Sequence, residues 1–343
     1  MEETNPAQRT SRYAGIDAAR VVAAAGVVFT HWLTGSEAIW LKQASRFAVP
    51  FFIAAAVFFT VNQCFSGRAI PRMIGDRAWR ILLPYIMWSA VYFLLKYVIS
   101  GWIIGGIHPH FSLSDAVDGF GGHLWFLPFI FLVGVCAVVS AKIATRSAAL
   151  SAVLALGACF ATGIVLRAFP ASTGNLDRWP YELPIALIMF AITVSTQRGW
   201  ITVARHGLLS FGFLATAVAL VLWSLKYESF PDRRACQLAG IALLLAGISM
   251  PSERIPAWLS RLGRLGFGVY ITHGLLIMVL HKLFGKVGHG SQTTVLVAYP
   301  FVLAGAFAFT AICYRLPVVR LMMPTRQAGP RRQKDQLALA SSR

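Results

Sequence analysis

Charged side chains are scarce in this sequence, and acidic ones most of all. Only 13% of the 343 residues are charged and 57% are hydrophobic, whereas about 25% of an ordinary soluble domain is charged. With a mean hydropathy of +0.65, this composition excludes a water-soluble globular protein. The 31 lysines and arginines outnumber 13 acidic residues. They stand in small groups between apolar runs, so we expect a membrane protein and no nucleic-acid partner.

Several patterns that would assign a chemistry are also missing. The five cysteines lie in or beside apolar runs without paired spacing, which argues against a disulfide framework or a CxxC metal site. The absence of GxSxG and P-loop motifs disfavours a serine hydrolase or an ATPase. His108 and His110 lack the acidic or cysteine neighbours of a metal site, so no metal and no bound cofactor is expected. His110 and Asp115 match the H-x4-D spacing of glycerolipid acyltransferases, but they fall in an expected outer loop.

Ten apolar runs are each about long enough to cross the ~30 Å apolar core of a bilayer. We therefore predict an all-α, polytopic transmembrane helical bundle of about ten spans over residues 13–316. It lies between a short amino tail (1–12) and a basic, disordered carboxyl tail (317–343). The runs are 13–34, 47–65, 80–99, 124–141, 147–167, 181–196, 206–225, 235–250, 265–283 and 293–314.

The distribution of lysine and arginine predicts the orientation of these spans. With ten spans, one side and both tails carry 20 of these residues, and the connections on the other side carry nine. We therefore expect both termini in the cytoplasm and the protein in a bacterial-type inner (plasma) membrane. The smaller, outer group includes Lys42, Arg46, Arg178 and Arg234. The sequence shows no internal repeat, so it does not support a transporter built from duplicated halves.

The first apolar run contains three ionisable residues, each of which costs about 3 kcal/mol or more at membrane depth. Asp17 precedes Arg20 by one helical turn and is placed to pair with it. Arg20 and His31 are 11 residues apart, so helix geometry puts them within about 20° of one another and about 16 Å apart along the axis. Interfacial charges and a structural histidine would explain the same pattern, so this run alone leaves both interpretations open.

Arginines also gather at the inner start of the third run. Arg77 and Arg80 are spaced i,i+3 in DRAWRILLPY, so both project from one helical face, where they are able to grip a phosphate. Arg72 lies one to two turns earlier. Ordinary positive-inside charge accounts for these residues equally well.

Four further polar or aromatic residues lie in later apolar runs, either at an end of the run or inside it. His123 and Trp125 stand at the outer start of the fourth run, where an interfacial aromatic belt is the simpler explanation. Tyr270 and His273 lie one turn apart in the ninth run. Core packing accounts for Tyr270 as well as a place in an active site does.

Taken in order, these segments resemble the acyltransferase-3 family of integral membrane acyltransferases. IDAARVVAAAGVVFTHW, with Arg20 and His31, resembles the family's Arg-x10-His motif in the first span. VPFFIAAAVFF, RAWRILLPY, HLWFLP and FGVYITH then resemble its VPFFF-like second span, RxxR third span, outer His-Leu-Trp-Phe segment and late Gly-x-Tyr-x-x-His segment. The resemblance covers about residues 13–316. The chain departs from the pattern at Ala55 and Ala56, where the family commonly has a Ser-Gly pair.

The resemblance implies an O-acyltransferase that moves an acyl group, most often acetyl from acetyl-CoA, to a sugar hydroxyl of a surface polysaccharide or lipid-linked glycan. His31 is then the expected general base, since imidazole is the usual base near pH 7. Arg20 is its same-face catalytic partner. The remaining candidates are Arg77, Arg80 and Arg72 for the CoA phosphates, and Asp17, His123, Trp125, Tyr270 and His273 as lining of the active site.

Two other functions remain compatible with the sequence. A carrier or exporter of a glycan or small solute would also use buried Asp17, Arg20 and His31 as a relay. An acyltransferase acting on a small-molecule glycoside would need the same residues as one acting on a polysaccharide. Binding of acyl-CoA by the arginines of the third run separates the enzyme from the carrier, because a carrier has no need of a thioester site.

Overall fold

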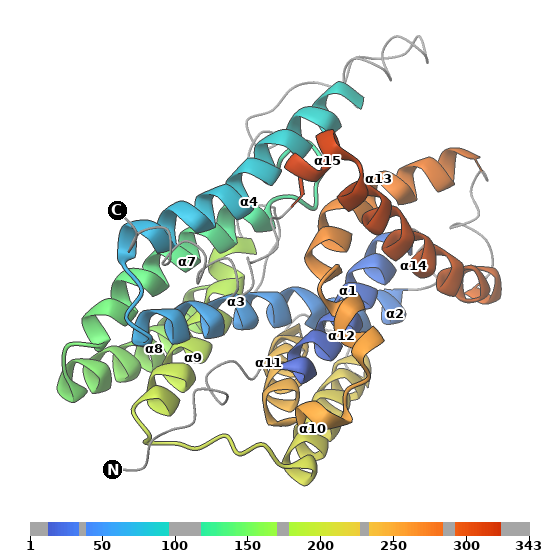
Figure 1. The fold of residues 1–343 in the computed structure, drawn as a ribbon. Helices are drawn as coiled ribbons and strands as arrows, with labels where there is room; N and C mark the ends of the chain where they lie inside the picture. Colours follow the sequence, from blue (N-terminus) through green and yellow to red (C-terminus); the bar gives the residue numbers. More distant parts are fainter. Residues whose placement is uncertain are drawn as a thin grey trace.

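The computed structural model describes residues 13–33, 39–95, 118–169, 178–226, 233–283 and 292–323. In these ranges the chain forms helices joined by turns, with no strand (Figure 1). The expected all-α class is therefore confirmed. The amino tail 1–12 lies outside the described residues, and so do His108, His110 and Asp115.

Ten long helices in the described part of the chain correspond to the ten predicted runs. They are α1 (Ala14–Trp32), α3 (Ala48–Phe65), α4 (Ile70–Phe93), α7 (Phe126–Ala144), α8 (Ala148–Ala168), α9 (Arg178–Gln197), α10 (Gly207–Lys226), α11 (Arg233–Ser249), α13 (Gly266–Leu283) and α14 (Gln292–Arg315). Three short helices join them: α2 (Ile39–Ala44), α12 (Ala257–Gly263) and α15 (Pro317–Leu321).

Seven of the described helices are long and apolar enough to cross a membrane, and α12 with α13 would make an eighth span bent by 59°. The protein is therefore an integral membrane protein. α11 is apolar but shorter than these spans. α4 begins ten residues before the predicted run, because Pro71 suits a first helical turn and helix formation does not require apolar residues. The ten-span count and the orientation of the termini stay predictions.

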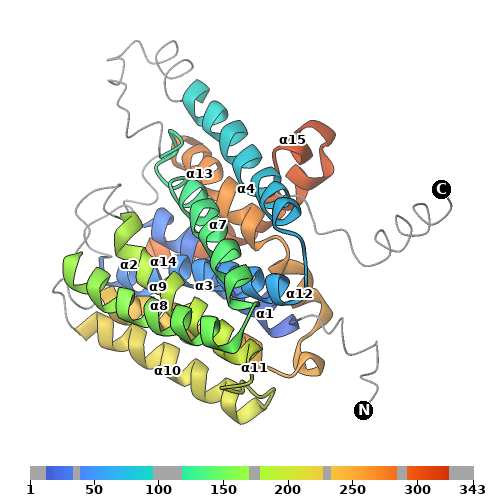
Figure 2. The same cartoon turned by 90° about the vertical axis from the view of Figure 1, so that its left-hand side faces the viewer.

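α3 is the central helix of the bundle (Figure 1), and it packs against α1, α7, α9 and α11. Most of its residues are apolar, and Phe51, Ile53 and Val61 are fully buried. α8 and α10 lie at the edge of the bundle in both views (Figure 2), each paired with the helix that follows it. Large apolar side chains such as Phe160 and Phe211 are exposed there, as expected for surfaces that face lipid.

Glycines allow α1 to approach its neighbours at backbone distance. A Cβ atom on Gly263 of α12 would lie 2.0 Å from the carbonyl oxygen of Asp17. A Cβ atom on Gly15 would lie 2.3 Å from the carbonyl oxygen of Gly247 in α11. Small residues at such crossings are the usual means by which membrane helices pack closely, and here they fix the amino-terminal half of α1.

The chain stays ordered where the carboxyl tail was expected to begin, at residue 317. α15 starts with Pro317 in its first turn and returns toward α4, where the indole nitrogen of Trp88 donates to the carbonyl of Met322 at 3.1 Å. Met323 is buried. The boundary of the packed domain therefore lies several residues beyond the predicted 316, and residues 324–343 are outside the described part.

We predict that Gly263→Ala lowers the free energy of unfolding of the detergent-solubilised protein by roughly 1–3 kcal/mol, the usual cost of overpacking. Its melting temperature should fall accordingly. The added methyl group would collide with the backbone of Asp17, which cannot move without shifting α1. Gly75→Ala is the matched control, because nothing lies within 4 Å of a Cβ there and alanine favours a helix by about 1 kcal/mol over glycine. An unchanged melting temperature for Gly263→Ala would show that α12 does not pack on α1 in this way.

Candidate active site

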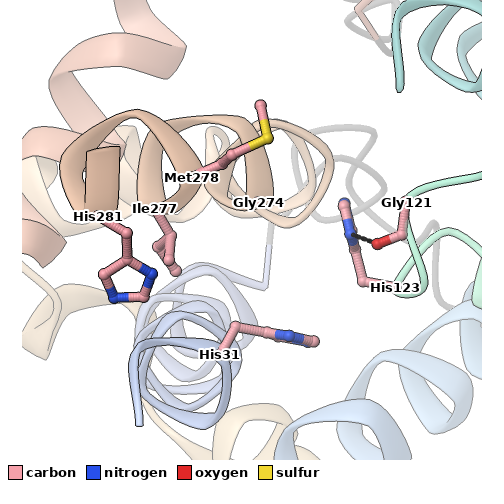
Figure 3. A pocket seen from close by; sticks show the side chains of 7 residues that line it. All are labelled: His31, Gly121, His123, Gly274, Ile277, Met278 and His281. Carbon is pink, nitrogen blue, oxygen red and sulfur yellow. Dashed lines mark hydrogen bonds between the residues drawn. The ribbon is translucent and has the colours of Figure 1, made fainter. Parts of the chain in front are cut away.

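An open cavity of about 440 Å³ lies where α1, the turn before α7 and α13 meet. Seven residues line it, and Figure 3 shows His31 extending from α1 toward the space beside His123. These segments are far apart in the sequence, so the cavity exists only in the folded bundle. The lining residues are His31, Gly121, His123, Gly274, Ile277, Met278 and His281.

Three imidazole rings meet at this cavity. The ring centre of His273 lies 4.9 Å from that of His31 and 4.8 Å from that of His123, and His31 and His123 are 5.8 Å apart. His123 is 4% exposed and His273 is fully buried, whereas the side chain of His31 is exposed. His31 is thus the most exposed member of the cluster.

Backbone carbonyls hold the two buried rings. Nδ1 of His123 lies 2.8 Å from the carbonyl oxygen of Gly121, and the hydroxyl of Tyr270 donates to the carbonyl of His123. Nδ1 of His273 lies 3.1 Å from the carbonyl oxygen of Val269, which places its proton on that nitrogen. Nε2 of His273 is then a buried acceptor, and it has no hydrogen-bond partner among the described residues.

Gly274 brings α13 close enough to form this cluster. A Cβ atom at that position would lie 2.6 Å from Cε1 of His123 and 2.8 Å from the hydroxyl oxygen of Tyr92. The rings of Tyr92 and His123 are themselves 5.2 Å apart between centres. His123 is therefore enclosed by Tyr92 on one side and by the bare backbone of α13 on the other.

His281 of the cavity wall stacks on an aromatic residue at the end of α1. The ring of Trp32 lies parallel to that of His281, with 5.1 Å between centres and 19° between planes. Ile277 and Met278 line the cavity on the same helix as His281. The cavity therefore combines an imidazole-rich side with an apolar side.

The amino-terminal half of α1 carries an ion pair. Nη1 of Arg20 lies 2.8 Å from Oδ1 of Asp17, as the spacing predicted, and Ser260 donates to the other carboxylate oxygen at 2.9 Å. The guanidinium of Arg20 also lies 5.1 Å from the centre of the Phe59 ring. α1 is an unbroken helix, so Arg20 keeps the same face as His31, but neither Asp17 nor Arg20 lines the cavity.

The arginines of α4 occupy three different environments. Arg77 donates to the hydroxyl of Thr60 and lies against Gly134 of α7, where a Cβ atom would be 2.2 Å from its Nη1. The Thr60 hydroxyl in turn donates to the carbonyl of Ala56 at 2.5 Å. Arg80 is half-buried and Arg72 is exposed. None of the three arginines lines the cavity. If they bind the donor, they do so in a part of the protein that is separate from the cavity.

Comparison with known proteins decides the family. The acyltransferase-3 family model, described as an acyltransferase domain, matches residues 13–315. The chain belongs to the acyltransferase-3 family. No curated protein and no solved structure matches the chain. The match runs from α1 to the end of α14, so this acyltransferase domain includes both the cavity and the arginines of α4.

Four candidate residues of this acyltransferase lie at the cavity or next to it. His31 and His123 line it, and His273 and Tyr270 lie directly behind it. Trp125 instead packs against Phe129, with 6.0 Å between ring centres.

Five of the residues that line the cavity were not among the candidates. Four of the five start at Gly274 and follow the i, i+3, i+4, i+7 spacing of one helical face, which is a signal that periodicity alone would have given. The missed residues are Gly121, Gly274, Ile277, Met278 and His281.

We predict that Gly274→Ala lowers acyl transfer by about ten- to a hundredfold, because the methyl group would displace His123 and narrow the cavity, and small misplacements are costly in catalysis. Free CoA released from acetyl-CoA by the purified acyltransferase measures the rate. Gly305→Ala in α14 is the control, since its nearest contact would be an ordinary 3.7 Å. A parental rate for Gly274→Ala would mean that the position of His123 does not matter to the reaction.

Proposed function

We propose that this acyltransferase moves an acyl group, most simply acetyl, from acyl-CoA to a hydroxyl of a sugar in a surface polysaccharide or lipid-linked glycan. One observation carries the proposal: His31 is an exposed imidazole on the wall of an open cavity, in a chain of an acyltransferase family. A sugar hydroxyl is a weak nucleophile until a base removes its proton, and imidazole is the most common base. The cavity has a volume within the usual range for small-molecule sites.

The simplest reaction is direct transfer. A ring nitrogen of His31 takes the proton of the acceptor hydroxyl while its oxygen attacks the thioester carbonyl carbon. The carbon–sulfur bond then breaks, the new ester leaves with the acceptor, and the imidazolium returns its proton to the CoA thiolate. Attack by His31 itself, followed by transfer from an acyl-imidazole, is a two-step form of the same chemistry.

The donor would enter from the cytoplasm, where the arginines of α4 are expected. CoA carries a pyrophosphate and a 3′-phosphate, and guanidinium groups bind phosphate through paired hydrogen bonds. Arg77 and Arg80 are the proposed contacts, with the exposed Arg72 at the entrance. Arg20 would hold the donor or support the oxyanion. This arrangement assumes an inner membrane and two cytoplasmic termini, which the lysine and arginine distribution favours.

A small-molecule glycoside is the second candidate acceptor. The cavity is open and about 440 Å³ in volume, which admits one sugar ring of a free glycoside as readily as the end of a polymer. Two observations disfavour a carrier. The chain belongs to an acyltransferase family, and the charge of Arg20 is already paired with Asp17.

We predict that His31→Ala reduces CoA release by roughly 10²- to 10⁴-fold, the usual contribution of a general base. The assay uses full-length protein in nanodiscs, acetyl-CoA and a total glycan extract of the host. His206→Ala is the matched control, because His206 is exposed and outside the cavity, and it should retain the parental rate. A fully active His31→Ala protein would remove the base from the mechanism.

We predict that Arg77→Ala raises the KM for acetyl-CoA at least tenfold and changes kcat less, because a charged contact to a phosphate is lost. Direct binding of CoA, measured by calorimetry, should weaken in parallel. Arg146→Ala, at an exposed position in the turn after α7, serves as the control. If the parent neither consumes acetyl-CoA nor binds CoA, the carrier would become the better explanation.

A further inference from the structure

The ring of His273 lies behind the cavity, and one of its nitrogens is unused. His273 is fully buried and does not line the cavity, whereas His31 stands on the cavity wall. Nδ1 of His273 lies 3.1 Å from the carbonyl oxygen of Val269, and Nε2 has no hydrogen-bond partner among the described residues. A buried acceptor without a partner costs free energy and is rare in proteins. We therefore expect Nε2 to meet a donor in the working protein.

Three rings with polar groups surround His273 in the part of the chain that the structure describes. They belong to His123, His31 and Tyr270, with 4.8, 4.9 and 6.0 Å between ring centres. The hydroxyl of Tyr270 already donates to the carbonyl of His123. Both ring nitrogens of His123 lie against backbone carbonyl oxygens, at 2.8 and 3.4 Å. His31 is therefore the neighbour whose N–H group is left to match Nε2 of His273.

The rings of His31 and His273 are placed for such a hydrogen bond. Their planes are inclined by 52°, so the two rings do not stack on one another. When a nitrogen of each ring points at the other ring, this separation leaves about 3 Å between the two nitrogens, the length of an ordinary hydrogen bond. The side chain of His31 is exposed, which leaves room for its ring to turn toward His273.

We propose that His273 is a positioning residue for the base, and that its Nε2 accepts a hydrogen bond from one ring nitrogen of His31. The inference rests on the proposed acyl transfer and adds the group that orients His31 in that reaction. The bond keeps the proton of neutral His31 on the nitrogen that faces His273, so the lone pair lies on the other nitrogen, which faces the cavity. The acceptor hydroxyl gives its proton to that second nitrogen, and the first nitrogen keeps its own.

A neutral acceptor would thus perform the part that a buried carboxylate performs in a catalytic triad. In both cases the acceptor selects one tautomer of the base and holds its ring against rotation. When His31 becomes the imidazolium, its N–H group donates more strongly, because hydrogen bonds from charged donors are stronger than those from neutral ones. The cavity-facing nitrogen then passes its proton to the CoA thiolate, and the bond to His273 lasts through the cycle.

The first test compares two amides of different length at this position. The side-chain amide in His273→Gln reaches about as far as Nε2, and that in His273→Asn reaches only as far as Nδ1. We expect His273→Asn to lower kcat about ten- to a hundredfold, because a misdirected base is costly, with parental KM values for acetyl-CoA and for the acceptor. His273→Gln should recover most of kcat. His206→Asn, at an exposed position outside the cavity, is the control.

Two kinetic results would contradict the positioning role. A parental kcat in His273→Asn would show that the base does not need Nε2. Equal losses in His273→Asn and His273→Gln, with a changed elution profile of the purified protein, would show that the buried ring matters only for packing.

The second test observes the bond itself and does not depend on activity. Nitrogen-15 NMR spectra of full-length, histidine-labelled protein in lipid bilayers, recorded above neutral pH, distinguish the two neutral tautomers of each ring. We expect one tautomer for His31, a correlation between its protonated nitrogen and Nε2 of His273, and a mixture of tautomers in His273→Asn. The same His31 signals in parent and His273→Asn would overturn the bond. A parent that releases no CoA would overturn acyl transfer and the catalytic role of the bond, while the spectra still decide whether the bond exists.

Discussion

The backbone contact between α1 and its neighbours is the constraint on which the rest of the site depends. Gly15 meets Gly247, and Gly263 meets Asp17, with no side chain between the helices. α1 can therefore neither rotate nor slide without a collision. Because the helix is unbroken, fixing its amino-terminal half also fixes the direction of His31 at its other end.

The bend between α12 and α13 makes the second part of the site. α12 contacts α1 near Asp17, the chain then turns by 59°, and α13 continues past the carboxyl-terminal half of α1. His273 and Gly274 reach His31 and His123 for this reason. A straight helix could not touch α1 at the ion pair and also carry a glycine against His123.

Hydropathy and helical periodicity predicted the helices of this fold better than they predicted the contacts between those helices. Apolar runs of membrane length gave the helices, and the three-residue spacing gave the Asp17–Arg20 pair. Periodicity assigns a residue to a face but does not say which helix covers that face. The meeting of His31 with His123 was therefore not predictable from spacing, and Trp125, although two residues from His123, turns toward Phe129.

A cation in apolar surroundings gives a physical reason to expect an anionic ligand. Arg77 lies between α3 and α7 with a threonine hydroxyl as its partner. Retaining such groups costs free energy unless an anion compensates them. The phosphates of CoA would supply that anion at α4.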